Sequence, residues 1–283
     1  MSALVQAADL LREVNGSHPP LLVDVRWSLD GPDRAGYETG HLPGAVFCDL
    51  DAELAAPPGD GGRHPLPSRE QITRTLQRLG IGDDRDVVAY DGGNALPAAR
   101  AWWCLRWAGR DRVRVLDGGL LTWVAAGGVL ESGDVAPTPT TAHVRLGQMP
   151  TVSADDVARE AAGVLLDVRT AVRYRGESEP IDPVAGHIPG AVSCPVGAVM
   201  ADDGRYLPPE QLRSVLAPVL PASAPLPPSR TDGTPAVTAY CGSGVTAAQM
   251  VLALHEAGVE AALYPGSWSE WIRDPSHPIA TGD

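Results

Sequence analysis

The sequence predicts an α/β fold of two tandem domains, each built on a parallel sheet flanked by helices. Its 283 residues suggest two domains, since a domain usually holds roughly 150 residues. Four short segments of the first half recur in the second half in the same order, which indicates a duplicated domain. Within each half, short apolar runs rich in β-branched residues alternate with stretches of helical periodicity, as in a parallel sheet covered by helices.

The recurring segments define the duplication. Each segment returns 143 to 150 positions later, and this nearly constant spacing means that a whole domain was duplicated. In one pair, Asp91 stands where the second copy has Cys241. The pairs are LVDVR at 22–26 with LLDVR at 165–169, GHLPGAV at 40–46 with GHIPGAV at 186–192, VAYDG at 88–92 with TAYCG at 238–242, and DGG at 117–119 with PGS at 265–267.

The first copy is expected to alternate strands and helices. Residues 1–16 place Asp9, Arg12 and Glu13 among apolar positions, so they predict an amphipathic helix and not a signal peptide. Apolar β-branched runs predict strands, and the 3.6-residue period predicts helices. The expected strands are 21–25, 46–48, 87–90 and 113–116, and the expected helices are 68–79, 97–108 and 120–126.

The second copy follows a linker. Residues 131–150 contain three prolines and little periodicity, so they predict an interdomain linker lying along the surface. Ser153 is expected to cap a helix that runs through residue 161. A second proline-rich stretch, 218–235, is expected to be a surface loop. The predicted domains are therefore 1–130 and 151–283, with 131–150 between them.

A strand, a short loop and a helix are expected around Cys241. Residues 237–240 favour a strand, and the helical period after the loop ends at Gly258, where a C-terminal glycine is expected. The N–H groups of residues 242–246 are expected to point inward at one atom, a concavity suited to an anion. The positive end of the helix adds to this effect. We therefore expect Cys241 to be a nucleophilic thiolate.

Spacing excludes two other chemistries at this loop. A cysteine phosphatase needs an arginine six positions after its cysteine to bind phosphate, and that position is Ala247. A serine hydrolase elbow needs glycines two positions on either side of its serine, but Cys241 and Val245 flank Ser243 there. The four cysteines form no C-x-x-C pair, so neither a metal site nor a disulfide scaffold is expected.

Overall charge excludes some partners. A formal net charge of −13 disfavours nucleic acid and anionic membranes as partners, so an anionic small substrate would need a local positive pocket. No uncharged apolar run approaches the length of a membrane-spanning helix, about 18 residues. We therefore expect a cytoplasmic protein.

The sequence CGSGVTA at 241–247 resembles the active-site loop of the rhodanese superfamily of sulfurtransferases, and more narrowly that of its 3-mercaptopyruvate sulfurtransferases. The paired D-x-R and G-H-[LI]-P-G-A motifs extend the resemblance over essentially the whole chain. The resemblance implies two rhodanese-like domains, with the catalytic Cys241 in the second. An aspartate cannot carry a sulfane sulfur, so Asp91 implies that the first copy is inactive. Sulfur transfer through a Cys241 persulfide requires no cofactor.

The resemblance also implies companions for Cys241. A loop serine of mercaptopyruvate enzymes works with a histidine and an aspartate from the first domain, and Ser243, His41 and Asp33 occupy matching positions. The equivalent His187 belongs to the same turn in the second copy, so a structural role for His41 is the alternative. The backbone expected to cradle the sulfur and substrate belongs to Gly242, Gly244, Val245 and Thr246.

One arginine is expected to hold the anionic end of the donor. Arg173 matches an arginine that does so in this family, and a guanidinium suits the oxygens of a carboxylate or of thiosulfate. The mercaptopyruvate pattern has a second arginine several residues further on, but residues 177–182 read ESEPID. Arg175 is a candidate replacement, and a solvated arginine is the alternative.

The sequence therefore predicts a sulfurtransferase that moves a sulfane sulfur from 3-mercaptopyruvate or thiosulfate to cyanide, a small thiol or a thioredoxin-like protein. The absence of basic side chains at Gly242 and Ser243 favours mercaptopyruvate, whereas the missing second arginine weakens that preference. The alternative function is a persulfide carrier that loads once and delivers sulfur to a protein partner.

Overall fold

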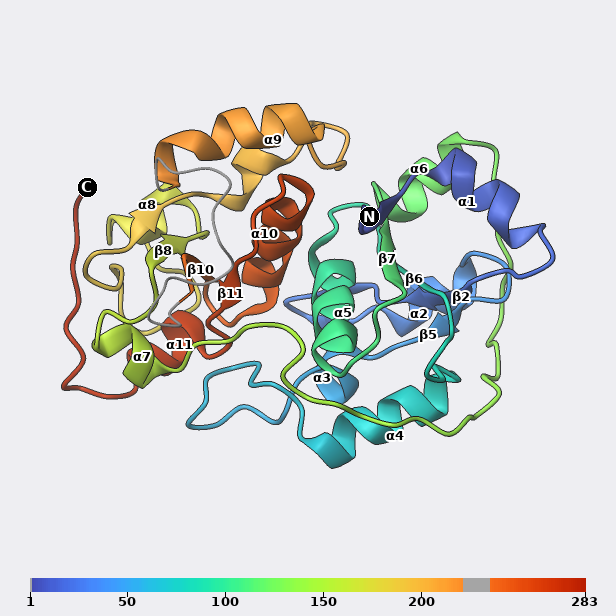
Figure 1. Cartoon of the computed structure of the whole chain (residues 1–283), viewed down its shortest axis with the longest axis horizontal. Coiled ribbons are helices and arrows are strands. Elements are labelled where there is room, and N and C mark those ends of the chain that lie inside the picture. The colour runs from blue at the N-terminus through green and yellow to red at the C-terminus, as the bar shows by residue number, and fades with distance from the viewer. Residues whose placement is uncertain (1, 221–234) are drawn as a thin grey trace. The chain divides into compact units, whose positions relative to one another are not determined.

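The computed structural model describes residues 2–220 and 235–283 (Figure 1). The expected surface loop at 218–235 lies mostly outside these described residues. The chain divides into two compact units, one for each sequence copy, but each unit also takes a short segment from the other copy. The first unit is Met1–Ala56, Leu66–Met149 and Ala201–Tyr206, and the second unit is Pro57–Pro65, Pro150–Met200 and Leu207–Asp283.

A five-stranded parallel sheet, in the order β1-β7-β6-β2-β5, forms the centre of the first unit. The central strand β6 is buried along its whole length, as a continuous apolar run is in a sheet covered on both faces. All four strands expected in this copy are confirmed to within one residue at each end. The strands are β1 (Leu4–Val5), β2 (Leu21–Asp24), β5 (Val46–Phe47), β6 (Val87–Tyr90) and β7 (Val113–Leu116).

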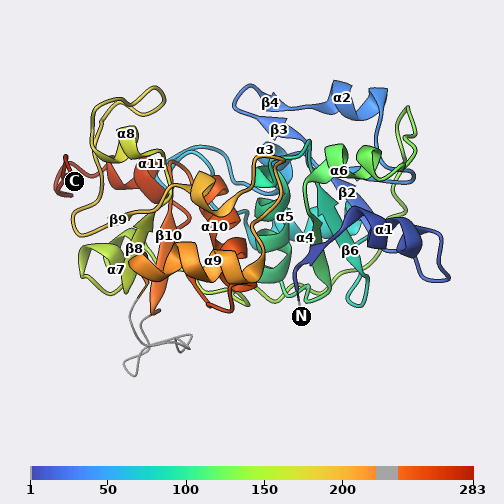
Figure 2. The ribbon, with the colours of Figure 1, turned by 90° about the horizontal axis from the view of Figure 1, so that it is seen from above.

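Helices cover both faces of this sheet. Figures 1 and 2 show α1 and α6 on one face and α3, α4 and α5 on the other. The four expected helices are present, and two short ones, α2 and α3, were not predicted because six and four residues are too few to show a helical period. The helices are α1 (Ala7–Val14), α2 (Arg34–Thr39), α3 (Leu50–Glu53), α4 (Arg69–Leu79), α5 (Leu96–Trp107) and α6 (Gly119–Ala125). A separate hairpin pairs β3 (Trp27–Ser28) with β4 (Gly31–Pro32).

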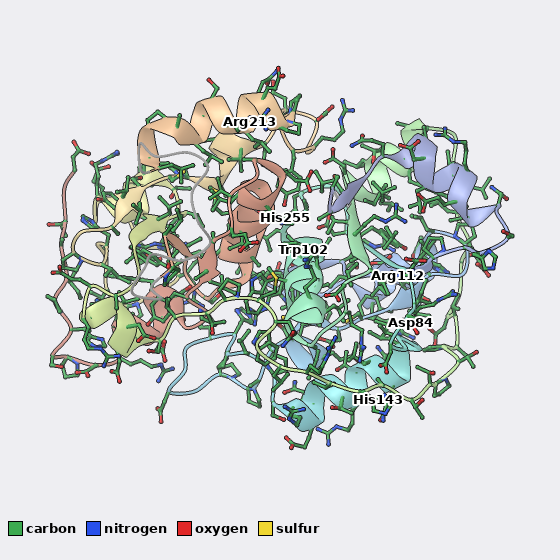
Figure 3. All side chains as sticks on the ribbon, viewed as in Figure 1. Asp84, Trp102, Arg112, His143, Arg213 and His255 are labelled. Atoms are coloured by element: carbon green, nitrogen blue, oxygen red, sulfur yellow. The ribbon has the colours of Figure 1, made fainter. Side chains whose placement is uncertain are left out.

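The segment expected to be a surface linker, up to Met149, belongs to the first unit and is bound to it. Its Thr140 N–H donates to the Gln77 carbonyl at 3.0 Å. The His143 N–H donates to one Asp83 oxygen at 3.0 Å, and its ring Nδ1 lies 2.7 Å from the other (His143 is labelled in Figure 3). Hydrogen bonding by His143 lowers the pKa of Asp83 to about 2. These bonds hold the linker along the unit's surface.

The second unit repeats the same sheet with four strands, in the order β11-β10-β8-β9, all parallel. This order matches β7-β6-β2-β5 of the first unit, because β11, β10, β8 and β9 are the copies of β7, β6, β2 and β5 respectively. The topology therefore agrees with the duplication. The strands are β8 (Val164–Asp167), β9 (Val192–Ser193), β10 (Val237–Tyr240) and β11 (Ala262–Leu263).

The helices of the second unit begin at the expected Ser153 cap. Its hydroxyl accepts the Asp156 N–H, and the Asp156 carboxylate accepts the Ser153 N–H. This helix ends at Ala158, earlier than expected, because Glu160 adopts a left-handed conformation with φ of 57°. The helices are α7 (Ala154–Ala158), α8 (Ala171–Tyr174), α9 (Pro209–Leu216), α10 (Val245–Glu256) and α11 (Ser267–Trp271), with 3₁₀ turns η1 (Val196–Val199) and η2 (Ala217–Val219). No helix within the described residues is long and apolar enough to cross a membrane.

Candidate active site

Cys241 follows the last residue of β10, at the carboxyl end of the sheet of the second unit. Its Sγ accepts the N–H groups of Gly244 at 3.1 Å and Ser243 at 3.4 Å. The loop is shorter than expected, because α10 begins at Val245 and places Thr246 in its first turn. Sγ therefore lies against two amide donors close to the positive N-terminal end of a twelve-residue helix.

Only glycine fits at position 244. Its φ of 80° is left-handed, and a Cβ there would lie 2.4 Å from the Pro265 carbonyl oxygen. The loop is also fixed from α11, whose Trp268 N–H donates to the Cys241 carbonyl at 3.0 Å. The Ser269 N–H donates to the Gly242 carbonyl at 2.9 Å. The cysteine loop is thus held rigidly before any substrate binds.

Ser243 has a histidine partner that the sequence did not indicate. Nδ1 of His64 lies 2.8 Å from Ser243 Oγ. His64 lies in the segment 57–65. This segment is part of the second unit, although the rest of that unit begins only at residue 150. The side chain of the adjacent Arg63 is bonded to Asp182. This segment therefore brings two basic side chains to the second unit.

Two guanidinium groups lie beside the cysteine loop. A Cβ at Gly242 would lie 2.7 Å from Nη2 of Arg63 and 3.5 Å from Nη2 of Arg173. Arg173 also donates to Glu179 at 2.7 and 2.9 Å and to Asp182 at 3.1 Å. Burial lowers the pKa of Arg63, and the nearby charge of Cys241 acts in the opposite direction. The site therefore brings together a cysteine sulfur, a serine–histidine pair and two guanidinium groups.

Two regions of the chain match one protein-family model. The model is the rhodanese-like domain, and it matches residues 6–126 and residues 153–274. The chain belongs to the rhodanese family. The two matched regions coincide with the two sequence copies, so the family accounts for the duplication as well as for the cysteine loop.

Relatives of this rhodanese are named as sulfurtransferases. The chain is 46% identical to "Putative thiosulfate sulfurtransferase SseB" of Mycobacterium tuberculosis (strain ATCC 25618 / H37Rv), covering 99% of this chain and 97% of that protein. It is 45% identical to "Probable 3-mercaptopyruvate sulfurtransferase" of Pseudomonas aeruginosa, covering 94% of each. The crystal structure of SseA from Escherichia coli, a 3-mercaptopyruvate sulfotransferase, matches with a TM-score of 0.79 at 30% identity, covering 95% of this chain and 100% of that one. The chain is a sulfurtransferase, and its relatives carry the names of two different donors.

His41 lies in the turn of the G-H-x-P-G motif of the first unit. The His41 side chain is fully buried within the first unit, with Nδ1 2.9 Å from the Tyr37 carbonyl oxygen and its ring stacked on Tyr37. His187 makes the same two contacts with Tyr174 in the second copy. Both histidines of the G-H-x-P-G motif therefore make the same local contacts in their own turns.

Asp33 also serves the local structure of the first unit. Its carboxylate accepts the Gly36 N–H at 2.8 Å and caps α2. The D-x-R motifs are structural ion pairs in both copies: Nη2 of Arg26 lies 2.8 Å from Asp24, and Nη2 of Arg169 lies 2.6 Å from Asp167. Asp33 thus caps a helix, and the D-x-R motif forms the same ion pair in both copies.

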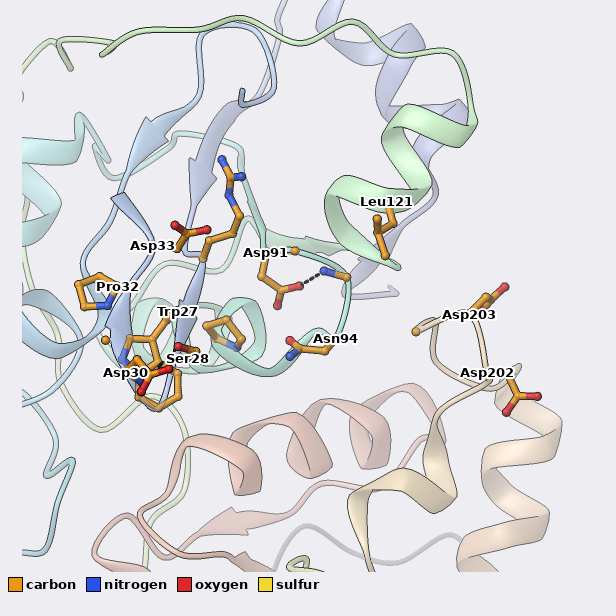
Figure 4. Close-up of a pocket in the computed structure, with 16 residues that line it drawn as sticks. Trp27, Ser28, Asp30, Pro32, Asp33, Asp91, Asn94, Leu121, Asp202 and Asp203 are labelled. Carbon is orange, nitrogen blue, oxygen red and sulfur yellow. Dashed lines mark hydrogen bonds between the residues drawn. The ribbon is translucent and has the colours of Figure 1, made fainter. Parts of the chain in front are cut away.

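In the first copy, the side chain of Asp91 fills the loop that corresponds to the cysteine loop of the second copy. Asp91 accepts N–H groups from Gly93 at 2.8 Å, Ala95 at 3.2 Å and Ala98 at 3.2 Å. Asp91 is one of the residues that line a cavity of about 710 Å³ within the first unit (Figure 4). The carboxylate therefore accepts amides of its own loop, and one of them, Gly93, corresponds to Ser243, whose N–H donates to Cys241 Sγ. Burial raises the pKa of Asp91.

The other cysteines are core residues. Cys48, Cys104 and Cys194 are buried, and no disulfide is formed by any of the four. Burial raises the pKa of all three thiols, and that of Cys194 reaches about 11. The Cys48 and Cys194 N–H groups donate to Asp24 and Asp167 respectively, so these two residues occupy equivalent positions. Within the described residues, no cluster of side chains suits a metal ion.

Proposed function

We propose that this rhodanese-family sulfurtransferase takes its sulfur from 3-mercaptopyruvate, and that Cys241 of the second unit carries the sulfur as a persulfide. The observation that carries the proposal is the 2.8 Å contact between His64 Nδ1 and Ser243 Oγ, two residues from a sulfur atom that accepts backbone N–H groups. This pair can move a proton beside the nucleophile.

The first half-reaction forms one bond and breaks another. The Cys241 thiolate attacks the donor sulfur of HS–CH₂–CO–COO⁻, an S–S bond forms, and the C–S bond breaks. The electron pair of the broken bond remains on the organic product as an enolate, which takes up one proton and becomes pyruvate. The transferred sulfur is oxidised as the donor carbon is reduced, so no external oxidant is needed.

Ser243 and His64 supply the proton. In this proposal the Ser243 hydroxyl donates to the developing enolate, and His64 returns a proton to the serine. The backbone N–H groups of the loop stabilise the charge on sulfur throughout. Thiosulfate needs no such proton, because sulfite leaves as a stable anion. A serine–histidine pair therefore favours mercaptopyruvate as the donor.

The second half-reaction releases the sulfur. A nucleophilic acceptor attacks the outer sulfur of the Cys241 persulfide and regenerates the thiolate. We propose cyanide, a small thiol or a thioredoxin-like protein as acceptor, and a cytoplasmic location. None of these steps calls for a cofactor.

Steady-state sulfur transfer to cyanide, with 3-mercaptopyruvate and thiosulfate as alternative donors, tests the proposal. The wild type should prefer mercaptopyruvate by tenfold or more in kcat/KM, which corresponds to about 1.4 kcal/mol of transition-state discrimination. Cys241→Ser should abolish transfer with an unchanged thermal unfolding curve, while Cys194→Ser, a buried control, should retain it. A thiosulfate preference would refute the donor assignment, and activity in Cys241→Ser would refute the mechanism. A single turnover per Cys241 would indicate the persulfide carrier instead.

A further inference from the structure

Arg63 and Arg173 converge on the backbone of Gly242, next to the nucleophile. The two Nη2 atoms lie 2.7 and 3.5 Å from the position that a Cβ of Gly242 would take. The side chains of Arg63 and Arg173 retain 28% and 13% of their exposure, so neither side chain is fully enclosed. Two partly open guanidinium groups beside a nucleophilic sulfur form an anion-binding arrangement.

One buried carboxylate fixes the distance between these two arginines. Nη1 of Arg63 is bonded to Oδ1 of Asp182, and Nη2 of Arg173 donates to Oδ2 at 3.1 Å. The Asp182 side chain is only 3% exposed. Asp182 therefore orients both guanidinium groups before a ligand arrives, which lowers the entropic cost of binding it.

The backbone of Arg63 is also fixed. Its N–H donates to Ser269 Oγ at 3.0 Å, and Ser269 also donates its own N–H to Gly242. The preceding Gly62 has a φ of 96°, and a Cβ there would lie 2.8 Å from the Gly266 carbonyl oxygen. The same helix, α11, thus positions both Arg63 and the cysteine loop.

The charges around these arginines nearly balance. Three guanidinium groups share three carboxylates through a continuous set of ion pairs. The members are Arg63, Arg169, Arg173, Asp167, Glu179 and Asp182. Because the three positive and three negative charges balance, little positive charge is left over, and a monoanion fits this site better than a dianion does.

We propose that Arg63 supplies the second donor-binding guanidinium that residues 177–182 lack, and that Arg63 and Arg173 together select a monoanionic 2-oxo-3-thiol carboxylate. This inference rests on the proposed function of the same site. Arg175, the replacement suggested by the sequence, is bonded instead to Glu177 at 2.7 Å. Arg63 differs from an ordinary surface arginine in its shared buried partner and its place beside Gly242.

Donor kinetics of Arg63→Gln and Arg175→Gln, as a matched pair, test the inference. Arg63→Gln should raise KM for 3-mercaptopyruvate by about 10- to 100-fold, the usual effect of losing a charged hydrogen bond, and Arg63→Lys should recover part of the loss. Arg175→Gln should leave KM within twofold of the wild type. Sulfur transfer from the preformed persulfide to 2-mercaptoethanol, a neutral acceptor, should fall far less than donor loading does in the two Arg63 variants and should be unchanged in Arg175→Gln.

A merely structural role for Arg63 predicts a different result. It would slow both half-reactions or lower the thermal unfolding midpoint while leaving KM for the donor unchanged, and that result would overturn the inference. If the wild type itself fails to load sulfur onto Cys241 from either donor, the proposed function fails as well. Loading by the wild type with equal KM values for Arg63→Gln and Arg175→Gln refutes the role of Arg63 alone.

Asp182→Asn gives a second test that keeps both arginines. Removing one negative charge leaves the guanidinium groups with more positive charge to share, so the kcat/KM for dianionic thiosulfate should rise relative to that for mercaptopyruvate by about threefold to tenfold. An unchanged donor ratio in a folded Asp182→Asn variant would contradict the charge argument.

Discussion

His64 Nδ1 and Ser243 Oγ lie 2.8 Å apart although 179 positions separate the two residues in the sequence. The contact exists because residues 57–65 of the first copy fold with the second unit. The segment 201–206 of the second copy folds with the first unit in return. Gly62-Arg63 and Gly204-Arg205 occupy corresponding places in these two segments, so the copies have exchanged equivalent pieces, and the exchange gives Ser243 its histidine.

Replacing His64 by Gln should slow sulfur transfer from 3-mercaptopyruvate. Loss of a proton-transferring side chain costs about 100-fold or more in kcat, whereas transfer from thiosulfate should fall by less than threefold because sulfite needs no proton to leave. Parallel kcat measurements with the two donors check this difference. His255→Gln, in the last turn of α10, is the matched control and should leave both rates unchanged. Equal losses with both donors would show that His64 has no role specific to mercaptopyruvate.

The strands, the longer helices and the nucleophile could be predicted from local patterns. The strands and longer helices are encoded by the periodicity and caps of their own residues. The strand, loop and helix around Cys241 also form one continuous stretch of sequence, so local patterns were enough to predict them. The histidine partner was not predictable in this way. Residues 57–65 have no secondary-structure period and lie far from Cys241 in the chain. The match of Gly62-Arg63 with Gly204-Arg205 in the second copy is a signal that could have marked this segment.

Replacing Gly244 by Ala should destabilise the protein and inactivate it. Its left-handed φ and the 2.4 Å approach of a Cβ to the Pro265 carbonyl combine strain with a clash, a cost of about 2–4 kcal/mol in the free energy of unfolding. Gly258→Ala is the control, because φ there is 84° but no atom lies within 4 Å of its Cβ; it should cost about 1 kcal/mol. Urea unfolding and sulfur transfer measure the two effects. Similar losses in both variants would mean that the Pro265 contact contributes nothing.

The contribution of Asp83 to stability should depend on pH. The His143 N–H and ring lower the pKa of Asp83 to about 2 from its ordinary value of 3.8. A carboxyl with a lowered folded-state pKa binds fewer protons when folded, so its stabilising effect is present above pH 3.8 and is lost as the pH falls towards 2. Asp83→Asn should therefore lower the urea midpoint at pH 6 by more than it does at pH 3. A pH-independent effect of Asp83→Asn would refute the assignment.

The buried tyrosines at the ends of β6 and β10 should stabilise the two units to the same degree. Tyr240 donates to Asp167 at 2.6 Å and accepts the Ile188 N–H at 3.2 Å, and Tyr90 accepts the Leu42 N–H at 3.1 Å in the first copy. Tyr240→Phe and Tyr90→Phe each leave such a buried N–H without its acceptor, at a cost of about 1–3 kcal/mol. Amide hydrogen exchange, which resolves the stability of each unit separately, should show loss of protection in β10 alone for the first variant and in β6 alone for the second.

Sulfur transfer should distinguish these two variants only weakly. Neither hydroxyl is bonded to Sγ of Cys241 in the described structure, and the cysteine loop is held by α11, so both variants should retain kcat within threefold of the wild type. A large loss of kcat in Tyr240→Phe alone, with β10 still protected from exchange, would show that the tyrosine hydroxyl acts on the cysteine loop beyond its part in the fold. Equal kcat values with unequal loss of protection would instead show that the tyrosine hydroxyl contributes more to the stability of one unit than to that of the other.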